Sequence, residues 1–280
     1  MLLNSSSTPI PLQPNPQQSS APGLPTDPAE PPKQKLPIGK RILYAIGLPL
    51  WVFLGFMLAQ ALVLAIVAGL QWLGVSFETA NASIVNTTVA AIVYALAILL
   101  VLGVPWLIKR RATTKEEVGL QRLPRWMDIV WAPAGMVVYL ILTTLVMAFA
   151  MQVLTFVDYE QAQETGFAQL GSQFEYILAF ISLVIVAPIA EEVLFRGYLF
   201  GKLRKYMPLW VTILIVSLLF AAVHFQWNVA IDVFVLSIVL CLLRVVSNSL
   251  WPSILLHMMK NGVAYYFLFI NPTLLSTLGG

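Results

Sequence analysis

Charged residues are scarce in this chain of 280 residues, since Lys, Arg, Asp and Glu make up only 10% of it. A soluble domain carries about a quarter charged residues, so the composition excludes a soluble fold. Hydrophobic residues account for 59%, and the mean hydropathy is +0.83. These values predict an integral membrane protein whose solvent is the lipid bilayer.

Cysteine is also scarce, and basic residues are absent from two of the segments between the apolar stretches. The single cysteine, Cys241, excludes an intrachain disulfide and a CxxC-type site. The net charge of +3 comes from short basic runs beside apolar segments, so no nucleic-acid partner is expected. Basic residues are absent from residues 74–83 and 157–174 but gather before the first apolar stretch and after the second and fourth. The positive-inside rule therefore predicts a cytoplasmic N-terminus. We expect an integral, multi-pass protein of the cell (plasma) membrane.

The first 38 residues have a different composition from the rest. Prolines recur from Pro9 to Pro37, interleaved with Ser, Gln and Asn. Such a segment buries too little apolar surface to offset its ordering entropy. We expect a disordered cytoplasmic tail over residues 1–38.

Apolar stretches fill the remainder of the chain. A helix needs about 20 apolar residues to cross the hydrocarbon layer. The predicted fold class is all-α, a polytopic bundle of about seven to eight membrane helices, with N-terminal membrane helices over 39–157 and a catalytic core over 175–270. No internal repeat is evident, which argues against the inverted-repeat plan of many transporters. The seven stretches are 42–73, 84–108, 128–156, 175–204, 209–225, 229–247 and 250–270.

Ionisable residues interrupt the last four of these stretches. Each costs about 3 kcal/mol on insertion scales, so each is a functional hypothesis. The chain has only two histidines, and both lie in predicted membrane segments. A single membrane histidine is commonly an interhelical hydrogen bond, but two histidines beside a carboxylate pair favour a site. The candidates are Glu191, Glu192, Arg196, His224, His257 and Asn261.

Spacing within the glutamate segment predicts separate roles. Glu192 and Arg196 are i,i+4 neighbours in the favourable order for an ion pair, which makes them supporting residues. Glu191 points about 100° away and has no local partner. Pro188 lacks an N–H, so a kink is expected just before the pair. Counting helical rise places His224 at the depth of Glu191 but His257 at a shallower level.

The chemistry of these residue types suits peptide-bond hydrolysis. Glu191 and His224 can take a proton from water and aim the hydroxide at a carbonyl carbon. His257 and Asn261, one turn apart on a helix, can stabilise the oxyanion. Zinc is the alternative, held by Glu191, His224 and His257, although the sequence contains no HExxH motif.

Three motifs resemble those of a known family. The segments EEVLFR (191–196), FAAVH (220–224) and HMMKN (257–261) are similar to the EExxxR, FxxxH and HxxxN motifs of the CPBP family, the CAAX-protease and bacteriocin-processing (Abi) membrane proteins. The resemblance covers about residues 175–270. It implies an intramembrane endopeptidase in which Glu191 and His224 activate water and His257 and Asn261 form the oxyanion side. It also implies a supporting role for Glu192 and Arg196, and we favour a mechanism without a metal cofactor.

Three functions are consistent with the sequence. The first is an intramembrane endopeptidase acting on a membrane protein or a lipidated, CAAX-like peptide. The second is a membrane scaffold or immunity factor that keeps the fold without turnover. The third is a proton-coupled transporter that uses Glu191 as an ion site. The complete polar set favours the enzyme, because a scaffold has no need of all these groups.

Overall fold

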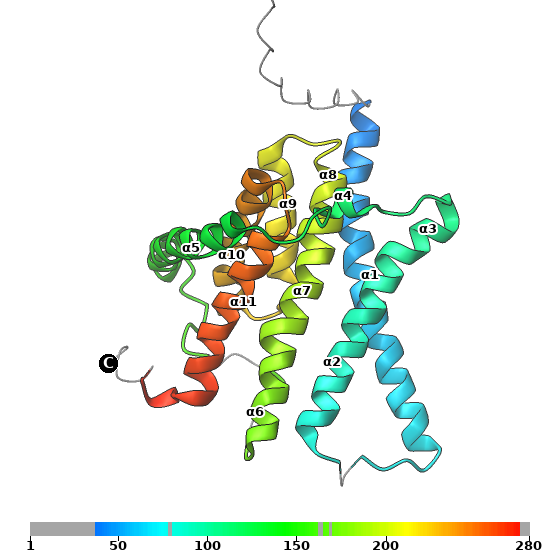
Figure 1. Ribbon diagram of the computed structural model, residues 1–280, viewed down its shortest axis with the longest axis vertical. Helices are drawn as coiled ribbons and strands as arrows, with labels where there is room; N and C mark the ends of the chain where they lie inside the picture. The colour runs from blue at the N-terminus through cyan, green and yellow to red at the C-terminus, as the bar shows by residue number, and fades with distance from the viewer. Residues whose placement is uncertain (1–36, 78–79, 162–164, 168–169, 275–280) are drawn as a thin grey trace, which may run out of the picture. The chain divides into compact units, whose positions relative to one another are not determined.

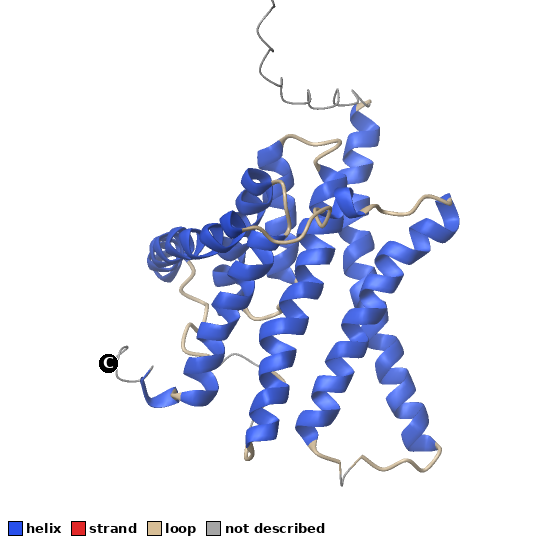
Figure 2. Cartoon of the chain, in the orientation of Figure 1, coloured by secondary structure: helices blue, strands red, loops and turns tan. Residues whose placement is uncertain are grey.

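The structure is a computed structural model that describes residues 37–77, 80–161, 165–167 and 170–274. Within these ranges the chain is largely helical and contains no strand, as Figure 2 shows. The predicted fold class, an all-α membrane helix bundle, is therefore confirmed. The tail expected over residues 1–38 lies outside the described residues except for its last two positions.

Each of the seven predicted apolar stretches contains a helix (Figure 1). Five of these helical runs are long and apolar enough to cross a membrane, and α9 is a shorter apolar helix. The elements are α1 (Ile38–Trp72), α2 (Ala82–Ile98) with η1 (Leu99–Gly103) and α3 (Val104–Lys109), α4 (Lys115–Val118), α5 (Trp126–Val153), α6 (Gln173–Phe180) with η2 (Ile181–Val186), α7 (Ala187–Glu192), η3 (Val193–Leu199) and α8 (Phe200–Leu203), α9 (Leu209–Ala222), α10 (Trp227–Ser247), and α11 (Trp251–Tyr265) with η4 (Tyr266–Ile270).

Helix α10 lies at the centre of the packing. It contacts α9, α5 and α11, and half of its most apolar window is buried. Helices α1, α2 and α5 bury far less of theirs and keep large aliphatic side chains exposed, among them Leu54, Ile92 and Leu145. Apolar exposure of this kind suits a lipid-facing surface, because lipid tails do not penalise it.

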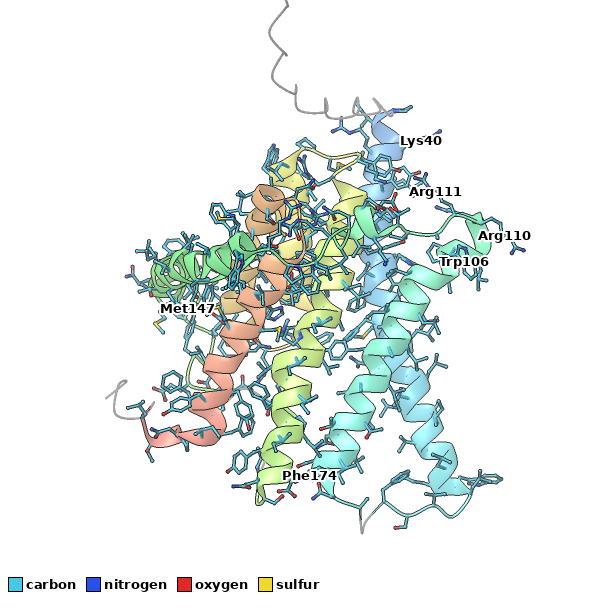
Figure 3. The ribbon with its side chains drawn as sticks, viewed as in Figure 1. Lys40, Trp106, Arg110, Arg111, Met147 and Phe174 are labelled. Atoms are coloured by element: carbon cyan, nitrogen blue, oxygen red, sulfur yellow. The ribbon has the colours of Figure 1, made fainter. Side chains whose placement is uncertain are left out.

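Basic side chains gather at one end of the helices. Figure 3 labels Lys40, Arg110 and Arg111 at that end and Phe174 at the opposite end. The arrangement follows from the sequence, since the basic loops flank the start of α1 and the end of α3, whereas Phe174 lies in the first turn of α6. The segregation of charge that underlies the positive-inside argument is thus present in the fold.

The short helix α4 packs closely against the fourth span. A Cβ atom on Gly197 would lie 2.5 Å from Cγ1 of Val118, and one on Gly201 would lie 2.5 Å from the carbonyl oxygen of Glu117. Glycine is therefore required at both positions for the loop to approach the helix. The contact places the Glu117 carboxylate 2.8 Å from Lys202 Nζ and 2.5 Å from Lys205 Nζ.

Candidate active site

Two adjacent glutamates meet a histidine from another span. Glu191 and Glu192 end α7, and His257 lies in α11, which packs against α7. His257 Nδ1 is 2.9 Å from Oε1 of Glu192, and its Nε2 is 3.7 Å from Oε2 of Glu191. The imidazole thus stands between the two carboxylates.

Glu192 forms the buried ion pair that its spacing predicts. Arg196 Nη1 donates to Glu192 Oε1 at 2.8 Å, and both side chains are fully buried. Because an ionised carboxylate only accepts hydrogen bonds, His257 donates Nδ1–H to the same oxygen. Glu192 therefore fixes the orientation of the His257 ring and turns Nε2 toward Glu191.

Phe220 packs against three members of the cluster. The Arg196 guanidinium lies over its ring, 4.2 Å from the centroid. The rings of His224 and His257 meet it edge-on, with centroids 5.0 and 5.8 Å away. Arg196 Nε and Nη2 have no hydrogen-bond partner among the described residues. The cation–π contact with the Phe220 ring stabilises the guanidinium in place of those hydrogen bonds.

His224 follows α9 and has its tautomer fixed by the backbone. Its Nδ1 is 2.7 Å from the carbonyl oxygen of Phe220, and a carbonyl only accepts, so Nδ1 carries the proton. In the neutral ring Nε2 is then the acceptor. Glu191 and His257 are both close enough to interact electrostatically with this imidazole.

Glu191 has a partner that the sequence did not reveal. The Tyr94 hydroxyl, from α2, donates to its Oε1 at 2.5 Å. Its other oxygen, Oε2, makes no hydrogen bond to the described residues and faces His257 Nε2 at 3.7 Å. The Glu191 side chain is 17% exposed, whereas that of Glu192 is fully buried. Glu191 is thus the glutamate with an accessible, unengaged oxygen.

Asn261 is engaged with the kinked part of the fourth span. Its Nδ2 donates to the carbonyl oxygen of Leu183 at 2.9 Å. In the π-helical register of η2 the Ala187 N–H bonds the Ser182 carbonyl, five residues earlier. The next donor in that register is residue 188, a proline without an N–H, so Leu183 lacks a backbone partner there. Asn261 supplies the missing donor and keeps its second amide hydrogen.

The prediction that His257 lies at a shallower depth than Glu191 is wrong. The count assumed that α11 begins at the depth of the basic turn near Lys205, but Leu250 N–H donates to the Gly119 carbonyl oxygen at 2.8 Å, and the neighbouring Val118 lies against Gly197. Helix α11 therefore begins beside Gly197. Since Gly197 is six residues from Glu191 and His257 is seven residues from Leu250, the two side chains reach the same level. The irregularity expected at Pro188 takes the form of η2, a π-helical segment just before it.

The three zinc candidates do not form a metal-binding group in this arrangement. Among the described residues no set of three or more His, Cys, Asp or Glu side chains comes together in ligand geometry. His257 directs Nδ1 to Glu192, and His224 directs Nδ1 to a backbone carbonyl. We therefore derive no step through a metal ion.

Two residues of the cluster were not predicted. Phe220 opens the FAAVH segment one turn before His224, so its position in the motif was the available signal. Tyr94 lies in a span outside all three motifs. A polar aromatic residue in the middle of an apolar stretch is only a weak signal, since buried tyrosines commonly find a local partner.

A family model supports the resemblance. The model of type II CAAX prenyl endopeptidase Rce1-like proteins matches residues 173–263, from the start of α6 to near the end of α11. The match confirms over this stretch the likeness to the CAAX-protease family that the three motifs indicate. It supports an intramembrane protease of CAAX type in general and leaves α1 to α5 outside.

Two curated relatives are similar to parts of the chain. An uncharacterized 24.3 kDa protein of Escherichia coli is 35% identical over 89 residues, which are 30% of this chain and 41% of the relative. The chain therefore spans less than half the length of that protein. The UPF0177 protein YxdF of Lactococcus lactis is 28% identical over 171 residues, which are 59% of this chain and 88% of its own. No solved structure matches the chain significantly.

Proposed function

We propose that this protein is an intramembrane endopeptidase that hydrolyses peptide bonds of a membrane-associated substrate. The observation that carries the proposal is the pairing of two acceptors with two donors in one cluster. Glu191 Oε2 and His224 Nε2 are the acceptors. His257 Nε2, in the doubly protonated ring, and the second amide hydrogen of Asn261, one turn along α11, are the proposed donors. A hydrolytic site needs both kinds of group around one carbonyl.

Glu191 is the proposed general base. A water molecule donates one hydrogen to Glu191 Oε2 and the other to His224 Nε2. As Oε2 takes the proton, the water oxygen bonds the substrate carbonyl carbon and the carbonyl electron pair moves to oxygen. Collapse of this intermediate breaks the C–N bond, and the proton on Glu191 passes to the leaving amine nitrogen.

His257 and Asn261 are the proposed oxyanion donors. This role requires a proton on both nitrogens of His257, with Nδ1–H held by Glu192 and Nε2–H donated to the oxyanion. Asn261 uses the amide hydrogen that Leu183 does not take. Glu192 and Arg196 have a supporting role, because they set the ring orientation without touching the substrate. These donors are fixed before the reaction, which lowers the cost of developing charge.

The substrate and the setting follow from the same arrangement. A site among membrane helices suits a membrane protein or a lipidated, CAAX-like peptide as the partner. We assign the catalytic core to residues 175–270, which follow the N-terminal membrane helices of residues 39–157. We place the protein in the plasma membrane with its N-terminus in the cytoplasm. A topology reporter after Lys115 is expected to report cytoplasm, and one at residue 160 the outer side. The opposite pattern overturns the orientation.

Purified protein in lipid vesicles, supplied with a farnesylated, internally quenched CAAX-type peptide, tests the proposal. The wild type is expected to cleave the peptide at one bond, as identified by mass spectrometry, and Glu191→Gln is expected to leave it intact. The same inactive variant, carrying a photo-crosslinker, is suited to trap the natural substrate. Equal behaviour of wild type and variant is the result that a scaffold predicts.

A metal assay accompanies the cleavage assay. With the direct mechanism, elemental analysis finds no stoichiometric zinc, and a strong chelator leaves turnover largely intact. One zinc per chain, lost together with activity on dialysis against chelator and restored by added zinc, overturns the direct mechanism and favours Glu191, His224 and His257 as ligands.

A further inference from the structure

We infer that Tyr94 is a positioning residue for the catalytic base, supplied by a part of the chain outside the three motifs. The inference rests on the proposed function, because it assigns the oxygen of Glu191 that accepts the proton. Tyr94 Oη donates to Oε1 of Glu191 at 2.5 Å. The contact joins α2 to α7, two elements 97 residues apart in the chain.

The hydrogen bond from Tyr94 makes the two oxygens of the Glu191 carboxylate different from each other. Oε1 is occupied by the phenol, whereas Oε2 makes no hydrogen bond to the described residues. Without Tyr94 the carboxylate can rotate about its terminal torsion, which is broad for glutamate. With it, Oε2 stays on the side of His257, which is where the proposed mechanism needs the base. Tyr94 thus holds the base in one productive orientation.

Tyr94 itself is held from a second span. The Phe56 ring, in α1, packs against the Tyr94 ring with centroids 5.9 Å apart. The phenol is therefore wedged between α1 and α7 and loses little further freedom when it donates. The first two spans, which the family model does not cover, gain a defined role in the site through this contact.

A tie at the far end of α2 sets the height of Tyr94. Asn81, the N-cap of α2, donates from Nδ2 to Oε1 of Glu175 in the first turn of α6 at 2.6 Å. Both spans begin at this end and run in the same direction (Figure 1). Tyr94 lies about 20 Å and Glu191 about 24 Å along their α-helical spans from this tie. The two lengths are similar, and the hydrogen bond shows that the two side chains meet.

Tyr94→Phe tests the inference, because it keeps the ring against Phe56 and removes only the hydroxyl. In vesicles with the farnesylated quenched peptide, kcat is expected to fall about 10- to 100-fold while KM changes less than about twofold. The matched control is Tyr139→Phe, which removes a hydroxyl that donates at 2.5 Å to Asp232, a carboxylate outside the proposed site. The control is expected to keep both constants.

Wild-type kcat in Tyr94→Phe, or an equal loss in Tyr139→Phe, overturns the inference. A selective rise in KM does so as well, since it assigns Tyr94 to substrate binding. In each of these cases cleavage by the wild type and its loss in Glu191→Gln leave the proposed function standing.

A thermal unfolding cycle in detergent decides the contact without turnover. Tyr94→Phe is expected to lower the unfolding midpoint of the wild type but to leave that of Glu191→Ala unchanged within about 1 °C. Equal shifts in both backgrounds mean that the two side chains do not interact, which overturns the inference. If the wild type cleaves no peptide, the proposed function fails. The thermal unfolding cycle then still tests whether Tyr94 and Glu191 interact.

Discussion

Two carboxylates in the membrane part of the molecule each accept a tyrosine hydroxyl at 2.5 Å, Asp232 from Tyr139 and Glu191 from Tyr94. Asp232 has two further partners, since Thr143 donates to Oδ1 at 3.0 Å and Lys260 Nζ lies 3.1 Å from Oδ2. Both of its oxygens are engaged and its charge is compensated. Glu191 has one engaged oxygen and one unengaged oxygen.

The difference separates a structural carboxylate from a reactive one. A carboxylate with all its partners holds helices together, and Asp232 joins α10 to α5 and α11 in this way. An accessible, unengaged carboxylate oxygen beside an imidazole is instead a candidate for chemistry. Glu191 fits the second description because its side chain is 17% exposed. Glu192 Oε2 also lacks a hydrogen bond to the described residues, but this side chain is fully buried and its charge is compensated by Arg196.

The largest expected effect on folding is that of Glu192→Gln. Arg196 is fully buried and has no other carboxylate within ion-pair distance among the described residues. Removing one partner of a buried pair leaves an uncompensated charge, which costs about 3–5 kcal/mol of unfolding free energy. Chemical denaturation in detergent measures the loss, and Glu191→Gln is expected to show far less of it.

A double variant provides the control for this prediction. Glu192→Gln with Arg196→Met removes both charges, so much of the lost stability is expected to return. Activity stays low, because His257 has lost the carboxylate that orients its ring. Equal stability of Glu192→Gln and wild type contradicts the account of the pair.

The next effect concerns the oxyanion side. His257→Ala and Asn261→Ala are each expected to lower kcat by about 10²–10³-fold, the usual loss for one oxyanion donor. Asn261→Ala carries an additional structural cost, because the Leu183 carbonyl then has no donor. Steady-state kinetics and thermal unfolding on the same preparations separate the two effects.

Pro188→Ala sharpens this test. Alanine restores the N–H that the π register needs for Leu183, so the stability cost of Asn261→Ala is expected to shrink in this background. The turnover loss persists if Asn261 serves the oxyanion. Full recovery of kcat in the Pro188→Ala, Asn261→Ala double variant shows instead that Asn261 only caps the helix.

The smallest expected effect lies outside the membrane segments, at Glu117. Partial burial raises its pKa, but hydrogen bonds from Lys202 and Lys205 outweigh burial and hold the pKa at about 2, below the ordinary 4.5. The lowered pKa means that this stabilisation is present above pH 4.5 and is lost as the pH falls toward 2. Solvent screening limits it to about 1 kcal/mol.

Thermal unfolding of wild type and Glu117→Gln across this pH range measures the contribution. The two midpoints are expected to converge as the pH falls toward 2. A difference that is the same at every pH means that the carboxylate charge is not what holds α4 to the fourth span.

Helical spacing predicted the local part of the site well. The apolar stretches predicted the helices, and the four-residue spacing of Glu192 and Arg196 predicted their ion pair. Contacts between distant spans were not predictable in this way. Tyr94 reaches Glu191 across 97 positions, and Asn261 reaches Leu183 across 78.

The depth of His257 was mispredicted for a related reason. The count assumed that α11 begins at the depth of the basic turn, and nothing in the sequence shows that Leu250 is bound to the Gly119 carbonyl beside Gly197. Pro188 was a visible signal of irregularity, but the register in which the chain absorbs it depends on the donor that Asn261 brings from α11.

The kcat of Asp232→Asn, measured beside that of Glu191→Gln in the same vesicles with the same quenched peptide, tests the central claim most directly. Glu191→Gln is expected to lose about 10⁴-fold, the upper range for a general base. Asp232→Asn is expected to stay within about threefold of wild type, because it removes no interaction with the transition state. Near-wild-type turnover in Glu191→Gln, or an equal loss in Asp232→Asn, contradicts the assignment of the unengaged carboxylate as the base.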